Sequence, residues 1–220
     1  FVSGWTVSDF DTVTYNGNAT ISSAQTKFGT TSLYLDGTGD SASIASNTDL
    51  GFGIGAFTIE SWVYRTTSGS YRTILDMRQS ASSELSPFIG IDSTNRFYVY
   101  INGSIVIQSL SSVPLNSWCH VALSRSGTST KLFQDGIQVG STYSDSNDYG
   151  TSKPLRIGLD YSGLYGFTGY VDEVRISNTA RYTGTFTTAT ASFDRDAFTG
   201  LLLHFNQQKQ YDISVLTKLD

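Results

Sequence analysis

Hydrophobic and polar positions alternate with a period of two along most of this chain. In the segment FTIESWVYR (57–65), Ile59 falls on one side of an extended backbone and Trp62 on the other. Both sides carry large groups, as expected of a strand that lies between two layers. Segments with a similar pattern, rich in Val, Ile, Tyr, Phe and Thr, are SLYL (32–35), RTILDM (72–77), RFYVYI (96–101), WCHVALSR (118–125), KLFQD (131–135), LRIGL (155–159) and GYVDEVRI (169–176).

Short turn signals separate these segments. Asn-Gly at 16–17 and 102–103, and Asp-Gly at 36–37 and 135–136, are typical of tight reversals, because glycine adopts positive φ without steric cost. No window of about eleven residues shows helical periodicity, although SNTARY (177–182) is compatible with a single helical turn. The pattern predicts an all-β fold of at least eleven strands in two packed antiparallel sheets.

The composition supports one large β domain and excludes some partners. The 220 residues are 39% hydrophobic, with 21 Gly and only 3 Pro, which suits many short strands around one sizeable core. The net charge is −5 and the 14 Lys and Arg are scattered, so no nucleic-acid partner is expected. No apolar run is long enough for membrane insertion. The lone Cys119 is expected to be a buried small hydrophobe. Because the first residue is Phe1, we expect the numbering to begin inside a longer or processed polypeptide.

Catalytic patterns are weak in this sequence. Glycosidases need two carboxylates across a cleft, but the glutamates form no E-x-D-x-x-E arrangement. Asp172 and the adjacent Glu173 should point to opposite faces of a strand. His120 and His204 lack metal-binding spacing, and no G-x-S-x-G motif is present. We therefore do not expect an enzyme. The three glutamates are Glu60, Glu84 and Glu173.

Two polar stretches rich in aromatic residues are candidates for sugar binding. STYSDSNDYG (141–150) and LDYSGLYGF (159–167) combine tyrosines with Asp and Asn, and aromatic faces with hydrogen-bonding groups are what sugars require. Two alternatives stay open: the rings cover the core, or they form a protein interface. The strand residues Trp62 and Trp118 are expected in the core, and the role of Trp5 stays open. The candidate carbohydrate-binding residues are Tyr143, Asp148, Tyr149, Asp160, Tyr161 and Tyr165.

Five segments, in a fixed order, carry a resemblance to a known family. From about Thr26 to Phe193 the chain resembles laminin-G-like, concanavalin A-like lectin jelly rolls, in the version found in phage and bacterial surface structural proteins. One segment would be weak support, but five in order are specific. The resemblance implies a two-sheet antiparallel jelly-roll sandwich. The segments are SLYLDGTGD, FTIESWVYR, WCHVALSRSGTSTKLFQDGIQVG, PLRIG and GYVDEVRISNTARYTGTF.

The resemblance also implies a function. It predicts a non-enzymatic, lectin-like structural module of a virion, such as a tail fibre, spike or capsid-associated protein, located at the virion surface or outside the cell. Its partners would be cell-surface glycans, other virion proteins or further copies of itself. Two alternatives are a purely structural decoration domain without ligand and the carbohydrate-binding part of a polysaccharide-degrading enzyme. Fold alone does not choose between them.

A structural calcium ion is the one cofactor expected. The turn LDGTGD (35–40) places Asp36 and Asp40 around glycines, and calcium prefers carboxylate and carbonyl oxygens. The resemblance implies that this turn lies near the strand bearing Asp172, which makes Asp36, Asp40 and Asp172 the candidate ligands. Alternatively, Asp36 caps its own turn and Asp172 accepts hydrogen bonds from backbone amides. Glu173 is expected to face solvent or to pair with Arg175.

The end of the chain allows two readings. FTGLLLHFN (198–206) resembles the opening strand of the same kind of module, so it either completes this domain or begins a second copy. We expect it to be a terminal strand of this domain, because a lone exposed apolar strand is prone to aggregation. Residues 1–206 would then form the jelly roll, and residues 207–220 a connector or contact segment.

Overall fold

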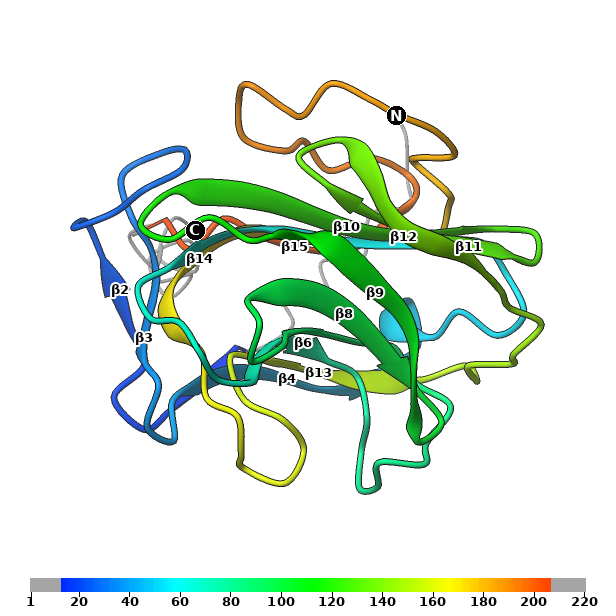
Figure 1. Cartoon of the computed structure of the whole chain (residues 1–220), viewed down its shortest axis with the longest axis horizontal. Helices are drawn as coiled ribbons and strands as arrows, with labels where there is room; N and C mark the ends of the chain where they lie inside the picture. Colours follow the sequence, from blue (N-terminus) through cyan, green and yellow to red (C-terminus); the bar gives the residue numbers. More distant parts are fainter. Residues whose placement is uncertain (1–12, 207–220) are drawn as a thin grey trace, which may run out of the picture.

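The computed structural model describes residues 13–206, whose fifteen strands form two antiparallel sheets packed face to face (Figure 1). The seven-stranded sheet contains, in spatial order, β1 (Thr14–Asn16), β4 (Ser41–Asn47), β13 (Lys153–Ile157), β6 (Arg72–Asp76), β7 (Phe88–Ile91), β8 (Arg96–Ile101) and β9 (Ser104–Ser112). The eight-stranded sheet contains β12 (Ile137–Ser144), β11 (Ser129–Gln134), β10 (Trp118–Ser126), β5 (Phe57–Arg65), β14 (Thr168–Ser177), β3 (Ser32–Asp36) and β2 (Thr20–Ser22), with β15 (Thr199–Leu203) paired to β14. The predicted all-β, two-sheet antiparallel sandwich is confirmed.

Helix is limited, among the described residues, to the 3-10 turn η1 (Thr48–Leu50). The single helical turn expected at 177–182 was wrong. The Thr58 hydroxyl of β5 donates to the Thr179 carbonyl and accepts from the Arg181 amide, so it takes the backbone groups that a helical turn would pair internally. Within residues 13–206, no helix has the length and hydropathy needed to cross a membrane.

The period-two pattern sends alternate side chains into the core. On β8, Phe97 and Val99 point between the sheets and are fully buried, whereas Tyr98 and Tyr100 point to the outer face of the seven-stranded sheet. Each buried aliphatic or aromatic side chain contributes about 1.5–3 kcal/mol relative to exposure. Alternation therefore both builds the core and leaves a set of aromatic rings on an outer face.

The outer face of the eight-stranded sheet is itself covered. The covering segment 178–198, orange in Figure 1, crosses above this sheet, and its Tyr182 and Phe186 rings stack 3.6 Å apart against Phe133. Further along, Lys27 and Phe28 lie over Trp62, with Lys27 Nζ 3.7 Å from the ring centroid. These layers explain why β5 is buried on both sides, as its sequence predicts. Trp118, expected in the core, is instead half-buried on this outer face beside Tyr64.

A buried ionic network lies beneath the covering segment. Glu60 Oε1 accepts hydrogen bonds from the Arg175 guanidinium at 2.8 Å, and Glu60 Oε2 lies 3.1 Å from His120 Nε2. The Tyr182 hydroxyl donates to the same oxygen at 2.8 Å. Burial alone would raise the pKa of Glu60, but His120, Arg175 and Tyr182 outweigh it, so the pKa is lowered. The network therefore ties β5, β10 and β14 to the covering segment.

A bulge in β14 corrects the prediction for its two carboxylates. Between Asp172 and Arg175 the pairing with β5 shifts register, and Glu173 has φ 51°. The extra residue interrupts the alternation, so Asp172 and Glu173 do not point to opposite faces. Glu173 was wrongly expected to face solvent or pair with Arg175. It is fully buried, and accepts from the Phe193 amide at 2.7 Å while lying 2.8 Å from His204 Nδ1.

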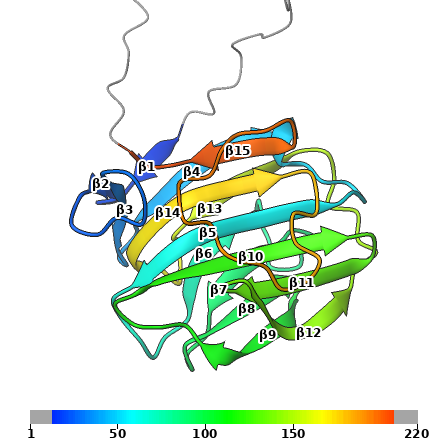
Figure 2. The same cartoon turned by 90° about the horizontal axis from the view of Figure 1, so that it is seen from above.

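The bulge also divides the free edge of β14 between two strands. β3 pairs with Thr168–Val171, and β15 pairs with residues 174–177 (Figure 2). Leu201 and Phe205 are buried, and Phe205 O accepts a 2.7 Å hydrogen bond from Thr31 Oγ1. Residues 199–203 are therefore part of this sheet. The connector expected at 207–220, and Trp5, lie outside the described residues.

Candidate functional site

The outer face of the seven-stranded sheet carries aromatic rings from neighbouring strands. Phe88 of β7 faces the same way as Tyr98 and Tyr100 of β8, with ring centroids 5.5 and 6.4 Å from theirs. Tyr98 is almost fully buried, and burial raises the pKa of its hydroxyl. Tyr100 stays partly exposed. The strands thus form an aromatic floor.

Two loops extend beyond this face and turn the floor into a groove. The loop that follows β13, residues 158–167, is the yellow loop of Figure 1, and the loop between β6 and β7, residues 77–87, lies beside it in teal. The groove has a volume of about 440 Å³. Its lining includes Tyr71, Arg78, Phe88, Tyr98, Tyr100, Ile105, Asp160, Tyr161, Leu164 and Tyr165.

Arg78 lines the groove, is almost fully buried and is held by hydrogen bonds and ring contacts. Its Nε and Nη2 each donate a 2.9 Å hydrogen bond to Asp76, and Nη2 lies 3.9 Å from Asp160 Oδ2. The Phe88 and Tyr161 rings flank the guanidinium, with centroids 4.6 and 4.8 Å from Cζ. Burial disfavours the charge on Arg78, but the two carboxylates outweigh it and raise its pKa. The charge of Arg78 is therefore balanced within the protein.

Asp160 organises the 160–165 loop rather than pointing freely into the groove. Its Oδ1 accepts from the Ser162 amide and hydroxyl and from the Leu164 amide, at 2.7–2.9 Å. The Tyr161 amide donates to Asp76 Oδ2 at 2.8 Å. These bonds fix the loop so that Tyr165, with φ 56°, projects outward and is 51% exposed. The loop is thus a preorganised wall.

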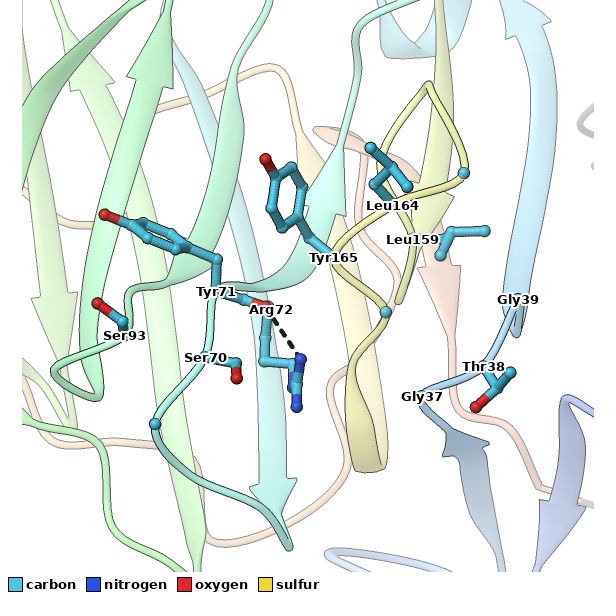
Figure 3. Close-up of a pocket in the computed structure, with 13 residues that line it drawn as sticks. Gly37, Thr38, Gly39, Ser70, Tyr71, Arg72, Ser93, Leu159, Leu164 and Tyr165 are labelled. Carbon is cyan, nitrogen blue, oxygen red and sulfur yellow. Dashed lines mark hydrogen bonds between the residues drawn. The ribbon is translucent and has the colours of Figure 1, made fainter.

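A second hollow of about 600 Å³ adjoins the groove on the other side of this wall. Tyr71 and Tyr165 line both spaces, and their rings meet edge to face. Figure 3 shows the Arg72 guanidinium directed into the hollow, between Ser70 and the 37–39 turn. The remaining lining is rich in glycine and hydroxyl groups: Gly37, Thr38, Gly39, Gly69, Ser93, Leu159, Gly163, Leu164 and Gly166.

The structure brings together three of the six predicted carbohydrate-binding residues, namely Asp160, Tyr161 and Tyr165. Tyr149 was placed wrongly, because its side chain is fully buried. Its hydroxyl donates to Asp145 Oδ2 at 2.8 Å, and its ring packs against Phe57 and Arg125. The loop tyrosine therefore covers the core, which was one of the alternatives.

Tyr143 and Asp148 also lie outside the groove. Tyr143 is half-buried against the core, and its hydroxyl accepts from Asn147 Nδ2 at 3.2 Å. Asp148 is exposed and accepts from the Gly150 amide at 2.8 Å. Both belong with Tyr149 to the 143–150 stretch and line neither hollow.

The three aspartates proposed as calcium ligands do not assemble into one site. Asp40 accepts hydrogen bonds from the Asn18 and Asp36 amides at 2.6 and 2.7 Å. Asp172 instead accepts hydrogen bonds from the Lys27, Phe28 and Glu173 amides. Asp36 pairs with Thr168, four residues before Asp172, which corresponds to about 13 Å along a strand. Among residues 13–206 no three His, Cys, Asp or Glu side chains are grouped to hold a metal. The structural calcium ion itself stays a prediction.

Sequence reasoning missed most of the residues that line the two hollows. Tyr98 and Tyr100 were assigned only to a strand, although their alternation with Phe97 and Val99 indicates rings on both faces. Arg72 and Arg78 bracket β6, and the pattern of this short strand gives no sign that both guanidinium groups reach one outer face. The alternation of Tyr98 and Tyr100 with Phe97 and Val99 was the signal from which an aromatic outer face could have been predicted.

The fold and the site together define a two-sheet β sandwich with an aromatic groove on one outer face. Residues 36–185 match the concanavalin A-like lectin/glucanases superfamily. This match covers more than half of the chain, which therefore belongs to that superfamily. No curated protein matches the chain.

Solved structures share the fold at low sequence identity. Domain 4 of AbnA, a GH43 extracellular arabinanase from Geobacillus stearothermophilus solved in complex with arabinotriose, is 16% identical with a TM-score of 0.60, over 77% of this chain and 82% of that one. A candidate carbohydrate-binding protein from Bacteroides ovatus is 18% identical with a TM-score of 0.58, and 74% of this chain spans 48% of its length. A botulinum neurotoxin type C structure is 14% identical with a TM-score of 0.57, over 78% of this chain and 44% of that one. None of these three is named as a virion component.

Proposed function

We propose that the protein is a non-catalytic carbohydrate-binding module that holds glycans in the groove on the outer face of the seven-stranded sheet. One observation carries the proposal: four accessible tyrosines, Tyr71, Tyr100, Tyr161 and Tyr165, converge on a single groove with fixed polar groups. Aromatic rings stack against the C–H faces of sugars, while a few placed polar groups bind the hydroxyls. The carbohydrate-related structures that share the fold support the same class of ligand.

Asp160, which lines the groove, and the buried Asp76, which pairs with Arg78 of the lining, support binding rather than hydrolysis. Asp76 holds Arg78 and the Tyr161 amide, and Asp160 holds the amides of its own loop. A glycosidase needs one carboxyl group that donates a proton and a second that attacks or activates water. Here both acidic side chains are occupied in positioning Arg78 and the loop. We therefore assign the groove to recognition.

Attachment to a glycan-bearing surface is the biological role that this binding would serve. The expectation of a virion tail fibre, spike or capsid-associated protein rests on the resemblance of the sequence and stays a prediction. The same holds for an extracellular or virion-surface location and for assembly with other copies. Binding to glycans would be common to all these settings.

Calorimetric titration with a panel of neutral and acidic oligosaccharides tests the proposal. We expect micromolar to millimolar affinity for at least one glycan, and weaker binding by Tyr165→Ala. The matched control is Tyr15→Ala, because Tyr15 is 45% exposed, close to the 51% of Tyr165, but lies on β1 outside the groove. If Tyr165→Ala and Tyr71→Ala both bind the glycan as tightly as the wild type, the site lies elsewhere. The absence of glycan binding would favour a purely structural decoration domain.

A further inference from the structure

The hollow beside the groove has a lining that differs from the rest of the surface in its charge. Of its thirteen lining residues, only Arg72 carries a charged side chain at neutral pH. The protein as a whole has a net charge of −5. A positive group inside a hollow of about 600 Å³ is thus a local exception. Charge complementarity points to an anionic ligand.

Arg72 has no acidic partner of its own. Its single hydrogen bond runs from Nη1 to the Tyr71 carbonyl at 3.2 Å, and it pairs with no carboxylate among residues 13–206. Its Nε is buried and makes no hydrogen bond. In contrast, Arg78 is paired with Asp76 and Arg175 with Glu60. The Arg72 guanidinium therefore keeps donors available in the hollow (Figure 3).

The acidic residues adjoining the hollow are occupied elsewhere. Asp36 accepts from the Thr38 amide at 2.7 Å, and Asp92 accepts from Thr94, the Arg96 amide and Gln108. Asp160 holds its own loop and lies near Arg78. None of these carboxylates neutralises Arg72.

The other lining groups suit a sugar. The hydroxyls of Thr38, Ser70 and Ser93 make no hydrogen bond within the described part of the chain. The Tyr71 and Tyr165 rings form the wall shared with the groove. Free hydroxyls, exposed rings and a guanidinium are together the set that a carboxylated pyranose requires, because a guanidinium fork matches a carboxylate in two hydrogen bonds.

We infer that the ligand is an acidic glycan whose carboxylated sugar binds in the hollow against Arg72. A neighbouring neutral sugar crosses the Tyr71–Tyr165 wall into the groove, where Arg78 is already neutralised by Asp76 and Asp160. This inference rests on the proposed carbohydrate-binding function and adds the chemical class of the ligand. Arg72 is then the residue that determines the preference for acidic over neutral glycans.

Matched pairs of oligosaccharides test the inference by calorimetry. The probes are oligogalacturonides against their carboxyl-reduced forms, and sialyllactose against lactose. We expect at least one acidic member to bind about tenfold more tightly than its neutral partner, as one charge-assisted contact predicts. Arg72→Gln should remove this preference and Arg72→Lys should retain part of it. Raising the salt concentration should weaken only the acidic member.

Arg96→Gln is the control for net charge, because Arg96 lies on the same sheet, outside both hollows. It should keep the preference, and melting temperatures should show that all variants are folded. If acidic and neutral members bind equally and Tyr165→Ala weakens both, the inference is overturned while the proposed function stands. Failure to bind any member of any pair overturns both the inference and the proposed function.

Discussion

Tyr71 and Tyr165 meet edge to face, with ring centroids 6.2 Å apart, although one precedes β6 and the other belongs to the loop after β13. Each is about half exposed, and each borders both the groove and the hollow. The pair is therefore the place where the two spaces meet. The Tyr71 ring also meets Tyr98 edge to face, with ring centroids 5.8 Å apart.

This contact makes the two rings dependent on each other in binding. We expect Tyr71→Ala and Tyr165→Ala each to weaken glycan binding by about 1 kcal/mol, roughly fivefold in Kd. The double variant should lose less than the sum, because each single substitution already removes the contact between the two rings. Calorimetry on the wild type, the two single variants and the double variant measures the coupling free energy between the two rings. Strict additivity would show that the rings act independently.

The Glu60 network should contribute strongly to stability. Glu60→Ala leaves Arg175 and His120 buried without their shared acceptor, so we expect a loss of about 3–5 kcal/mol in the free energy of unfolding at neutral pH. Because the pKa of Glu60 is lowered, its contribution should be lost as the pH falls below the unfolded value near 4.5. Urea unfolding measures both effects. The control is Asp194→Ala, an exposed acid of the covering segment, which should change stability by less than about 0.5 kcal/mol.

Asp172 should show the opposite dependence on pH. Burial raises its pKa from 3.8 to about 6, so the folded protein takes up this proton at a higher pH than the unfolded chain. Its contribution to the free energy of unfolding should therefore fall as the pH rises from about 4 to about 6, by at most about 3 kcal/mol. The difference in unfolding free energy between the wild type and Asp172→Asn should change across this window and level off above it. A constant difference from pH 4 to 7 would contradict the raised pKa.

Because Asp172 lies apart from Asp36 and Asp40, it should not affect any calcium binding at the turn that carries those two residues. If the turn at Asp36 and Asp40 binds calcium, chelation should lower the melting temperature of the wild type and of Asp172→Ala by the same amount. Asp36→Asn should abolish the effect, because it removes one of the two adjacent carboxylates. Scanning calorimetry with calcium and with excess chelator provides the measurement. Loss of the effect in Asp172→Ala would instead restore a site shared by all three.

The strands were predictable because alternation is a local property. FTIESWVYR indicated that β5 is covered on both sides, and the structure supplies the cover from segment 178–198 and from Lys27 and Phe28. The pattern could not identify which outer face stays open. Tyr64 and Tyr100 alternate with buried residues in the same way, yet only Tyr100 lies in the groove.

Residues governed by distant contacts were not predictable. Tyr149 is in a polar loop, and its burial depends on Phe57 and Arg125 from other strands. Glu173 sits within an apparently regular strand, and only the register shift against β5 reveals the bulge that buries it. Asp160 and Tyr161 were predicted because they lie in one short loop, whose geometry is largely local.

The divided edge of β14 has a consequence for the order of folding. β3 and β5 lie far upstream of β14 in the chain, and β15 lies downstream, yet all three pair with this one strand. A ribosome must therefore release residues through about Ser177 before β3 and β5 gain their central partner, and through Leu203 before the edge is complete. Pairings over such sequence separations form slowly, since the chain must close long loops first. Until then β3 can pair only with β2 and β5 only with β10, so each strand keeps one edge open, and such incomplete sheets are prone to aggregation during synthesis.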